Sequence, residues 1–205
     1  MAAINFDYHP RFFTATILEW KHLLKDDDYK DIVINSLTFL VDEGSIVIYG
    51  YVIMPNHIHL IWQIQDGFKQ DKIQMRFLKF TARQMKFKLQ KKDPVALEQY
   101  RVNAKDRIYQ IWERNPLSVD LWTEAVFDQK LEYIHNNPLL EKWHLAESPE
   151  NYRYSSAGFY ATGHDEFGLM TILAEWRGAY CPVGNTGFVG DNTNKGEKDG
   201  YGGHA

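Results

Sequence analysis

The chain has 205 residues, a formal net charge of −4 and one cysteine, Cys181, with 44% hydrophobic and 24% charged residues. This composition excludes a disordered, collagen-like or disulfide-stapled chain, and the length suits one domain with a substantial core. The N-terminus lacks a signal-peptide pattern, and no apolar run approaches the roughly 20 residues of a membrane span. We therefore expect a cytoplasmic protein that has no membrane partner.

Hydrophobic patterning predicts seven elements of secondary structure. Residues 11–18 are β-branched and aromatic, which is typical of a strand, and apolar steps of three and four in residues 28–42 predict an amphipathic helix. The remaining elements are two strands (45–53 and 57–64) joined by a turn, a helix (71–90), a strand (106–112) and a helix (124–137), followed by an aromatic loop (148–160). This order predicts an α+β fold, a ferredoxin-like split βαβ core with an antiparallel sheet and one added C-terminal helix.

The last residues of the chain differ in composition from the rest. After Cys181 there are seven glycines and few apolar residues. Such a segment cannot bury enough apolar surface to order itself. We therefore expect one domain over residues 1–180 and a flexible, Gly-rich tail over residues 181–205.

Positive charge is concentrated in the helix predicted at 71–90. Residues 69–92 contain nine lysines or arginines and a single acid. Five of these side chains recur at steps of four and three, which places them on one helix face: Lys72, Arg76, Lys79, Arg83 and Lys86. The face is either a solvated basic surface or a surface that follows nucleic-acid phosphates.

The motif His57-Ile58-His59 lies in a predicted strand, where side chains at positions i and i+2 point to the same face. Two neighbouring imidazoles are half of a metal site, although two such histidines can equally be ordinary strand residues. A metal would need a third protein ligand from another element.

The helix predicted at 124–137 offers such a ligand. Phe127, Leu131 and Ile134 form its core stripe, so Tyr133 faces away from the core. Asn137 follows one turn later, and the next residue, a proline, predicts that the helix ends there. Taken alone, the tyrosine can be a helix-packing residue and the Asn-Pro pair a simple helix stop.

In these residues the sequence resembles the single-tyrosine HUH transposases, and most closely the REP-associated tyrosine transposases of bacteria. The matching stretches are YVIMPNHIHL at 51–60, WERNP at 112–116, YIHNNP at 133–138 and PENYRYSS at 149–156. The likeness extends over roughly residues 5–170, and these stretches are far more specific than the two histidines alone.

The resemblance implies a DNA transposase and site-specific endonuclease. His57, His59 and Asn137 would hold a divalent metal ion, Mg²⁺ or Mn²⁺, and the added helix would be catalytic because it carries the nucleophile, Tyr133. This tyrosine would attack single-stranded DNA next to a hairpin, forming a 5′-phosphotyrosine and freeing a 3′-OH that can rejoin strands. His135 is the candidate base for the phenol proton.

The DNA partner gives the basic stripe a predicted role. Lys72, Arg76, Lys79, Arg83 and Lys86 would contact the DNA backbone, and Phe68, Trp112 and Tyr154 are candidates for stacking on unpaired bases. The sequence is compatible with a monomer and with a homodimer. Two alternatives stay open: a non-catalytic relative that only binds DNA hairpins, and an unrelated metal-dependent hydrolase.

Overall fold

The computed structural model describes residues 9–172. Their main elements are β1 (Arg11–Thr16), α1 (Asp27–Asp42), β2 (Ile46–Ile53), β3 (His57–Ile64), α2 (Gln70–Lys92), α3 (Pro94–Glu98), β4 (Leu117–Asp120), α4 (Glu124–Asn136) and α5 (Ala157–Thr162). Short 3₁₀ turns occupy Leu18–Trp20, Leu23–Lys25, Asn137–Leu139 and Pro149–Asn151. The predicted tail, residues 181–205, lies outside the described residues.

The four strands form one antiparallel sheet in the order β2-β3-β1-β4. This is the strand order of a ferredoxin-like core, and it confirms the predicted α+β class with an added helix. In the described part of the chain, no helix is long and apolar enough to cross a membrane.

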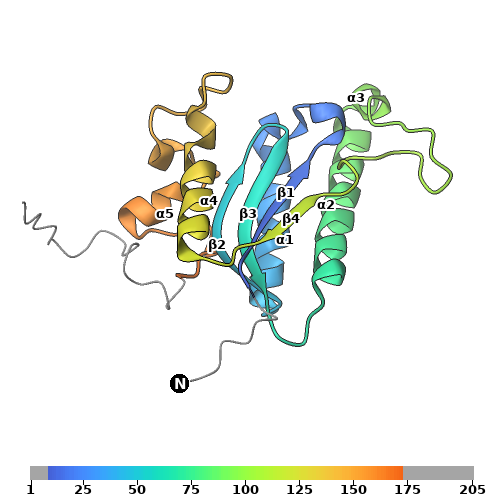
Figure 1. Cartoon of the computed structure of the whole chain (residues 1–205). Helices are drawn as coiled ribbons and strands as arrows, with labels where there is room; N and C mark the ends of the chain where they lie inside the picture. Colours follow the sequence, from blue (N-terminus) through green and yellow to red (C-terminus); the bar gives the residue numbers. More distant parts are fainter. Residues whose placement is uncertain (1–8, 173–205) are drawn as a thin grey trace, which may run out of the picture.

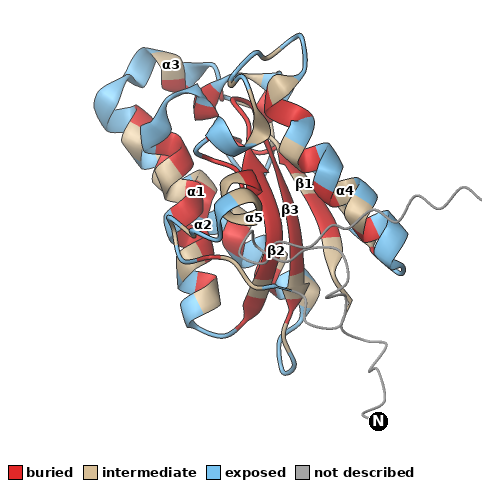
Figure 2. Cartoon of the chain, turned by 90° about the vertical axis from the view of Figure 1, so that its left-hand side faces the viewer, coloured by how far each residue is buried: buried red, intermediate tan, exposed pale blue. Residues whose placement is uncertain are grey.

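The sheet lies between two helical layers, with α1 and α2 on one face and α4 on the other (Figures 1 and 2). Neighbouring side chains of β1 point to opposite faces of the sheet. Phe13 contacts Phe77 of α2, with ring centroids 6.4 Å apart, whereas Phe12 contacts Tyr133 of α4, with centroids 6.2 Å apart. Both central strands are therefore buried on both faces, as Figure 2 shows by the continuous burial of β3.

The fourth strand is five residues or more beyond the predicted position. Residues 106–112 form a loop with isolated bridges, and β4 begins at Leu117. Trp112 forms a bridge to Ile17, just past the end of β1, so the predicted segment only touches the sheet. Asn115, with φ of 58°, and Pro116 interrupt the chain before it pairs with β1.

Candidate active site

His57 and His59 lie on the face of β3 that α4 covers. Their ring centroids are 4.7 Å apart, and each residue is 5% exposed. Ile58 and Leu60 alternate with them and point to the opposite face. The two imidazoles therefore form a buried pair below the end of α4.

Each imidazole is oriented by a polar neighbour. Thr14 is paired with His59 in the β1–β3 register, and its Oγ1 lies 2.7 Å from His59 Nδ1. Asn56, in the turn before β3, has its Oδ1 2.7 Å from His57 Nδ1. With both Nδ1 atoms engaged, Nε2 is the ring nitrogen of each histidine left for a ligand, and the rings are held in a fixed orientation.

Burial keeps both histidines neutral. It lowers the pKa of His57 to about 4, with a contribution from the charge of Lys142. It lowers the pKa of His59 to about 3, with contributions from His57 and Lys130. Neutral imidazole is the form that coordinates metal ions.

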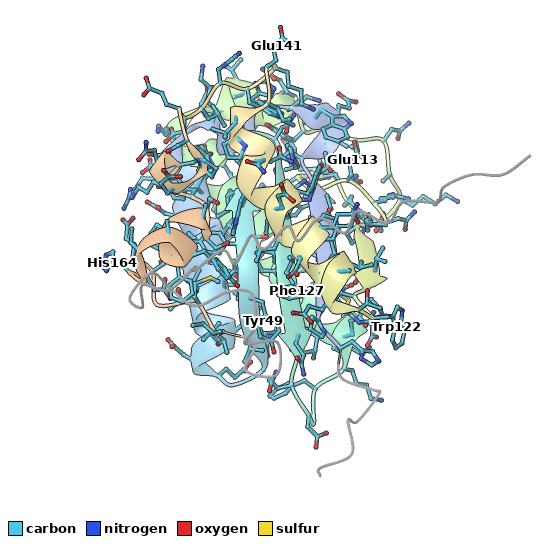
Figure 3. All side chains as sticks on the ribbon, turned by 60° about the vertical axis from the view of Figure 1, so that its left-hand side comes forward. Tyr49, Glu113, Trp122, Phe127, Glu141 and His164 are labelled. Carbon is cyan, nitrogen blue, oxygen red and sulfur yellow. The ribbon has the colours of Figure 1, made fainter. Side chains whose placement is uncertain are left out.

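α4 brings Tyr133 to this pair. Phe127, Leu131 and Ile134 are buried, as predicted for the core stripe, while Tyr133 is 47% exposed. Figure 3 shows Phe127 beside Tyr49 of β2 at one end of the helix. The ring centroid of Tyr133 lies 5.3 Å from that of His59 in the same chain. The predicted nucleophile and the predicted metal pair thus meet within one chain.

Asn137 lies at the end of α4, which stops at Asn136. The prediction that the α-helix ends at Asn137 is confirmed, although Asn137 itself keeps φ and ψ of −55° and −42° and begins a 3₁₀ turn. Leu140 N–H donates to the Asn137 carbonyl (3.3 Å) and closes that turn. Asn137 is 2% exposed, so its amide side chain is buried.

Among the buried side-chain polar atoms of residues 9–172 that have no hydrogen-bond partner, two belong to the predicted metal ligands: His59 Nε2 and Asn137 Oδ1. Buried polar atoms are nearly always paired, so each such atom calls for an explanation. One is an imidazole nitrogen and the other an amide oxygen, and both are metal-ligating atoms. Residues 9–172 contain no group of three or more His, Cys, Asp or Glu side chains that could hold a metal ion. An asparagine amide such as that of Asn137 does not belong to these residue types.

The position of α4 is fixed by a close approach to β2 at Gly50. A Cβ added there would lie 2.7 Å from Leu131 Cδ1 and 3.0 Å from Ile134 Cδ1. Real Cβ contacts are almost never shorter than 3.0 Å. Because Leu131 and Ile134 are fully buried, a side chain at position 50 would displace their ends, and glycine leaves them room at the depth where α4 presents Tyr133 to the histidines.

His135 belongs to a separate contact. Its Nε2 lies 2.8 Å from Ser156 Oγ, which also accepts a hydrogen bond from Tyr51 N–H (3.0 Å). Burial lowers the pKa of His135 to about 4. Since residues two apart lie about 200° apart around a helix, His135 faces away from Tyr133. The candidate base therefore ties α4 to the segment that follows it and does not face the phenol.

Two lysines give the site positive charge. Lys130 Nζ lies 5.8 Å from the centroid of the Tyr133 ring and 5.0 Å from that of Phe12. Lys142 Nζ lies 5.4 Å from the ring of Trp143, which itself lies 6.0 Å from His57. An anion next to the histidines would be attracted by both lysines.

The basic stripe is on α2, across the sheet from the histidines. Arg76 is paired with Glu43, and Lys72 Nζ is 3.7 Å from Asp71. The other three members line a groove of about 550 Å³ between α2 and residues 107–116. Five basic side chains line this basic groove, together with one acid, Glu113: Lys79, Arg83, Lys86, Arg107 and Arg114.

Of the aromatic residues expected to stack on bases, two are buried in the core. Trp112 is 6% exposed and donates its indole N–H to Thr81 Oγ1 (2.9 Å). Tyr154 is 2% exposed and donates its hydroxyl to Asp31 (2.9 Å). Phe68 is 36% exposed. The expectation is therefore wrong for Trp112 and Tyr154, which have no ring face free for a base.

Sequence reasoning missed the residues that support the site. Thr14 and Asn56 carried no signal, because an ordinary threonine in a strand and an asparagine in a turn are common. Lys130 did carry a signal in the sequence, because it precedes Tyr133 by three residues and so lies on the same helix face.

The fold is similar to that of a solved transposase structure. The structure of the REP-associated tyrosine transposase bound to a REP hairpin aligns with a TM-score of 0.55 and 15% sequence identity, over 74% of this chain and 78% of that one. A candidate transposase from Deinococcus radiodurans aligns with a TM-score of 0.42 and 14% identity, over 63% and 90% of the two chains.

No protein-family model matches the sequence, and no curated protein matches it. The shared feature is therefore the fold. The likeness in fold to the REP-associated tyrosine transposase agrees with the resemblance found in the sequence motifs.

Proposed function

We propose that this protein is a DNA transposase of the single-tyrosine HUH type, which cleaves and rejoins single-stranded DNA next to hairpins. One observation carries the proposal. His59 Nε2 is an unpartnered, buried ligand atom on the ring against which Tyr133 packs, and Asn137 Oδ1, one helical turn after Tyr133, is another. Most buried polar atoms are paired, and these two are of the kinds that bind metal ions, in the residues that the sequence motifs single out as ligands.

The residues present fit a divalent metal ion. His57, His59 and Asn137 supply two neutral imidazoles and one amide oxygen, a donor set that suits Mn²⁺ at least as well as Mg²⁺. Thr14 and Asn56 would keep Nε2 of each histidine available to it. When bound, the metal would supply positive charge that polarises a scissile phosphate.

The chain's own residues account for the other requirements. Tyr133 Oη would form a bond to phosphorus while the bond to the 3′ oxygen breaks, so that the phenol loses its proton and the 3′ oxygen gains one. Lys130 and Lys142 would attract the phosphate. Because the 5′-phosphotyrosine conserves one phosphodiester bond, the reverse attack by a 3′-OH rejoins DNA without a nucleotide cofactor.

The hairpin partner rests on the structural neighbour that is bound to a REP hairpin. In this chain the basic groove offers phosphate contacts from Lys79, Arg83 and Lys86, whereas Lys72 and Arg76 have acidic partners of their own. A monomer is sufficient for cleavage, since Tyr133 meets the histidines of its own chain, and a homodimer is not required.

The test is a covalent-adduct assay. The protein is incubated with a labelled single-stranded hairpin taken from the flanks of its own gene, with Mn²⁺ or Mg²⁺, and run on a denaturing gel. We expect a labelled band shifted by one protein mass, which disappears on chelation and in Tyr133→Phe.

Two controls make the result specific. Tyr160→Phe removes the hydroxyl of another tyrosine, which donates to the Tyr49 carbonyl (2.6 Å), and should keep the adduct. Hairpin binding without any adduct, by a folded wild-type protein, would contradict catalysis and favour the non-catalytic relative.

A further inference from the structure

Trp20 is an exposed indole beside the candidate active site. The residue is 60% exposed, and its ring centroid lies 6.0 Å from that of His57, edge to face. A single exposed apolar residue needs no explanation by itself. What singles out Trp20 is the way in which the backbone and a neighbouring side chain hold it.

The backbone at Trp20 adopts a conformation that side chains disfavour. Glu19 and Trp20 have φ of 54° and 58°, two consecutive left-handed residues without a glycine. The turn is held by hydrogen bonds from Trp20 N–H to the Ile17 carbonyl (2.9 Å) and from Glu19 N–H to the carboxylate of Glu113 (2.6 Å), which is labelled in Figure 3. Backbone strain of this kind is concentrated at functional sites.

One side chain links this turn to the histidine pair. Asn56 donates its amide N–H to the Trp20 carbonyl (3.1 Å), and its Oδ1 lies 2.7 Å from His57 Nδ1. The same residue therefore contacts both the backbone that carries the indole and the imidazole of His57. Trp143, 6.0 Å from His57, completes an aromatic rim around this histidine.

We infer that Trp20 is the platform on which an unpaired DNA base stacks next to the phosphate held at the histidine pair. The inference rests on the proposed function and adds a binding residue for the single-stranded part of the substrate. An indole face accepts any base, so it would position the strand without reading its sequence. A phosphate at His57 and His59 would bring a flanking base within reach of a ring 6.0 Å from His57.

The most informative variant is Trp20→Gly. Glycine adopts positive φ without penalty, so this substitution removes the indole and relieves the strained turn together. A structural role for Trp20 predicts a loss of stability, whereas stacking predicts weaker DNA binding at an unchanged or raised Tm. Trp20→Phe keeps a smaller ring and should restore part of the affinity.

The assay measures hairpin binding by fluorescence anisotropy with Mn²⁺ at one salt concentration. All proteins also carry Tyr133→Phe, so that the DNA stays intact. The hairpin has a single-stranded flank in which an abasic site is moved one nucleotide at a time. Trp122→Ala is the control: Trp122 is 64% exposed, and Figure 3 places it at the opposite end of the molecule from Glu141, the neighbour of Lys142.

We expect one abasic position to weaken binding by about five- to a hundredfold in the Trp20-containing protein. Trp20→Gly should weaken binding to the intact flank by the same factor and should be insensitive to that abasic site. Trp122→Ala should behave like the Trp20-containing protein.

Additive losses from Trp20→Gly and the abasic site, or no loss with Trp20→Gly, would overturn the inference. The proposed function is tested separately by the adduct of the wild-type protein. An adduct with additive losses refutes stacking alone, and a wild-type protein that neither binds nor reacts refutes both.

Discussion

Gly50→Ala is expected to lift α4 off the sheet. The new methyl carbon would lie 2.7 Å from Leu131 Cδ1 and 3.0 Å from Ile134 Cδ1, whereas carbon atoms pack best at about 3.5–4.0 Å. Leu131 and Ile134 are fully buried, so their ends have little room to turn away and α4 must take up part of the displacement. Such overpacking costs about 1–3 kcal/mol. The midpoint of urea unfolding should fall accordingly, and adduct formation should fall with it, because α4 carries Tyr133 and Asn137.

A second substitution should partly compensate for the first. Leu131→Val removes the δ carbons and should cost stability alone, yet it should restore part of the stability that Gly50→Ala loses. A double-mutant cycle measures this coupling, since contacting residues depart from additivity by about 0.5–3 kcal/mol. Additive losses would refute the idea that the depth of α4 is set at Gly50.

Three further predictions concern the histidines and the basic groove. Thr14→Val should weaken Mn²⁺ binding, measured by calorimetry, by about 10- to 100-fold because it removes the hydroxyl that orients His59. Thr14→Ser keeps a hydroxyl and should bind Mn²⁺ like the wild type. Equal Mn²⁺ affinities of the two variants would contradict this role of Thr14. The pKa of His57 and of His59 is lowered on folding, to about 4 and about 3. The unfolded chain therefore binds more protons below pH 6.5, so stability is complete above pH 6.5 and falls as the pH drops toward these values, by about 1.4 kcal/mol per unit for each histidine. Urea midpoints between pH 7 and 5 measure that slope, and a flat profile would count against neutral burial. Replacing Lys79, Arg83 and Lys86 by alanine should reduce the salt dependence of hairpin binding by about 0.7–0.9 in the log–log slope per lost phosphate contact, and replacing Lys72 and Arg76 should reduce it less; the reverse order would refute the assignment of the groove.

Local patterns were sufficient for much of the fold. Alternation through residues 57–64 predicted β3 and the common face of His57 and His59, and the apolar stripe of α4 predicted which of its residues are buried. The prediction of a strand at 106–112 was wrong because apolar content alone does not distinguish a paired strand from a loop that is anchored by isolated bridges and buried side chains. Ile111 and Trp112 are buried by packing beside β1, without a strand ladder.

The site was predictable only where its residues share an element or a motif. Contacts between distant segments, such as that between Thr14 and His59, depend on strand register, which no single segment encodes. Trp112 was a candidate for base stacking because the sequence alone does not distinguish a core tryptophan from one with an exposed ring. Trp20 was missed for the complementary reason: it follows a strand in an irregular turn, where periodicity says nothing about exposure.

The sheet separates the histidine pair from the basic side chains of α2, since α4 and α2 lie on opposite faces (Figure 2). A surface substitution on α2 reaches His57 or His59 only through the packed core, which responds to changes of volume more than to changes of surface charge. The two faces can therefore diverge independently. Under the proposed function, the charges on α2 that contact DNA phosphates could change while the residues around His57 and His59 stay the same.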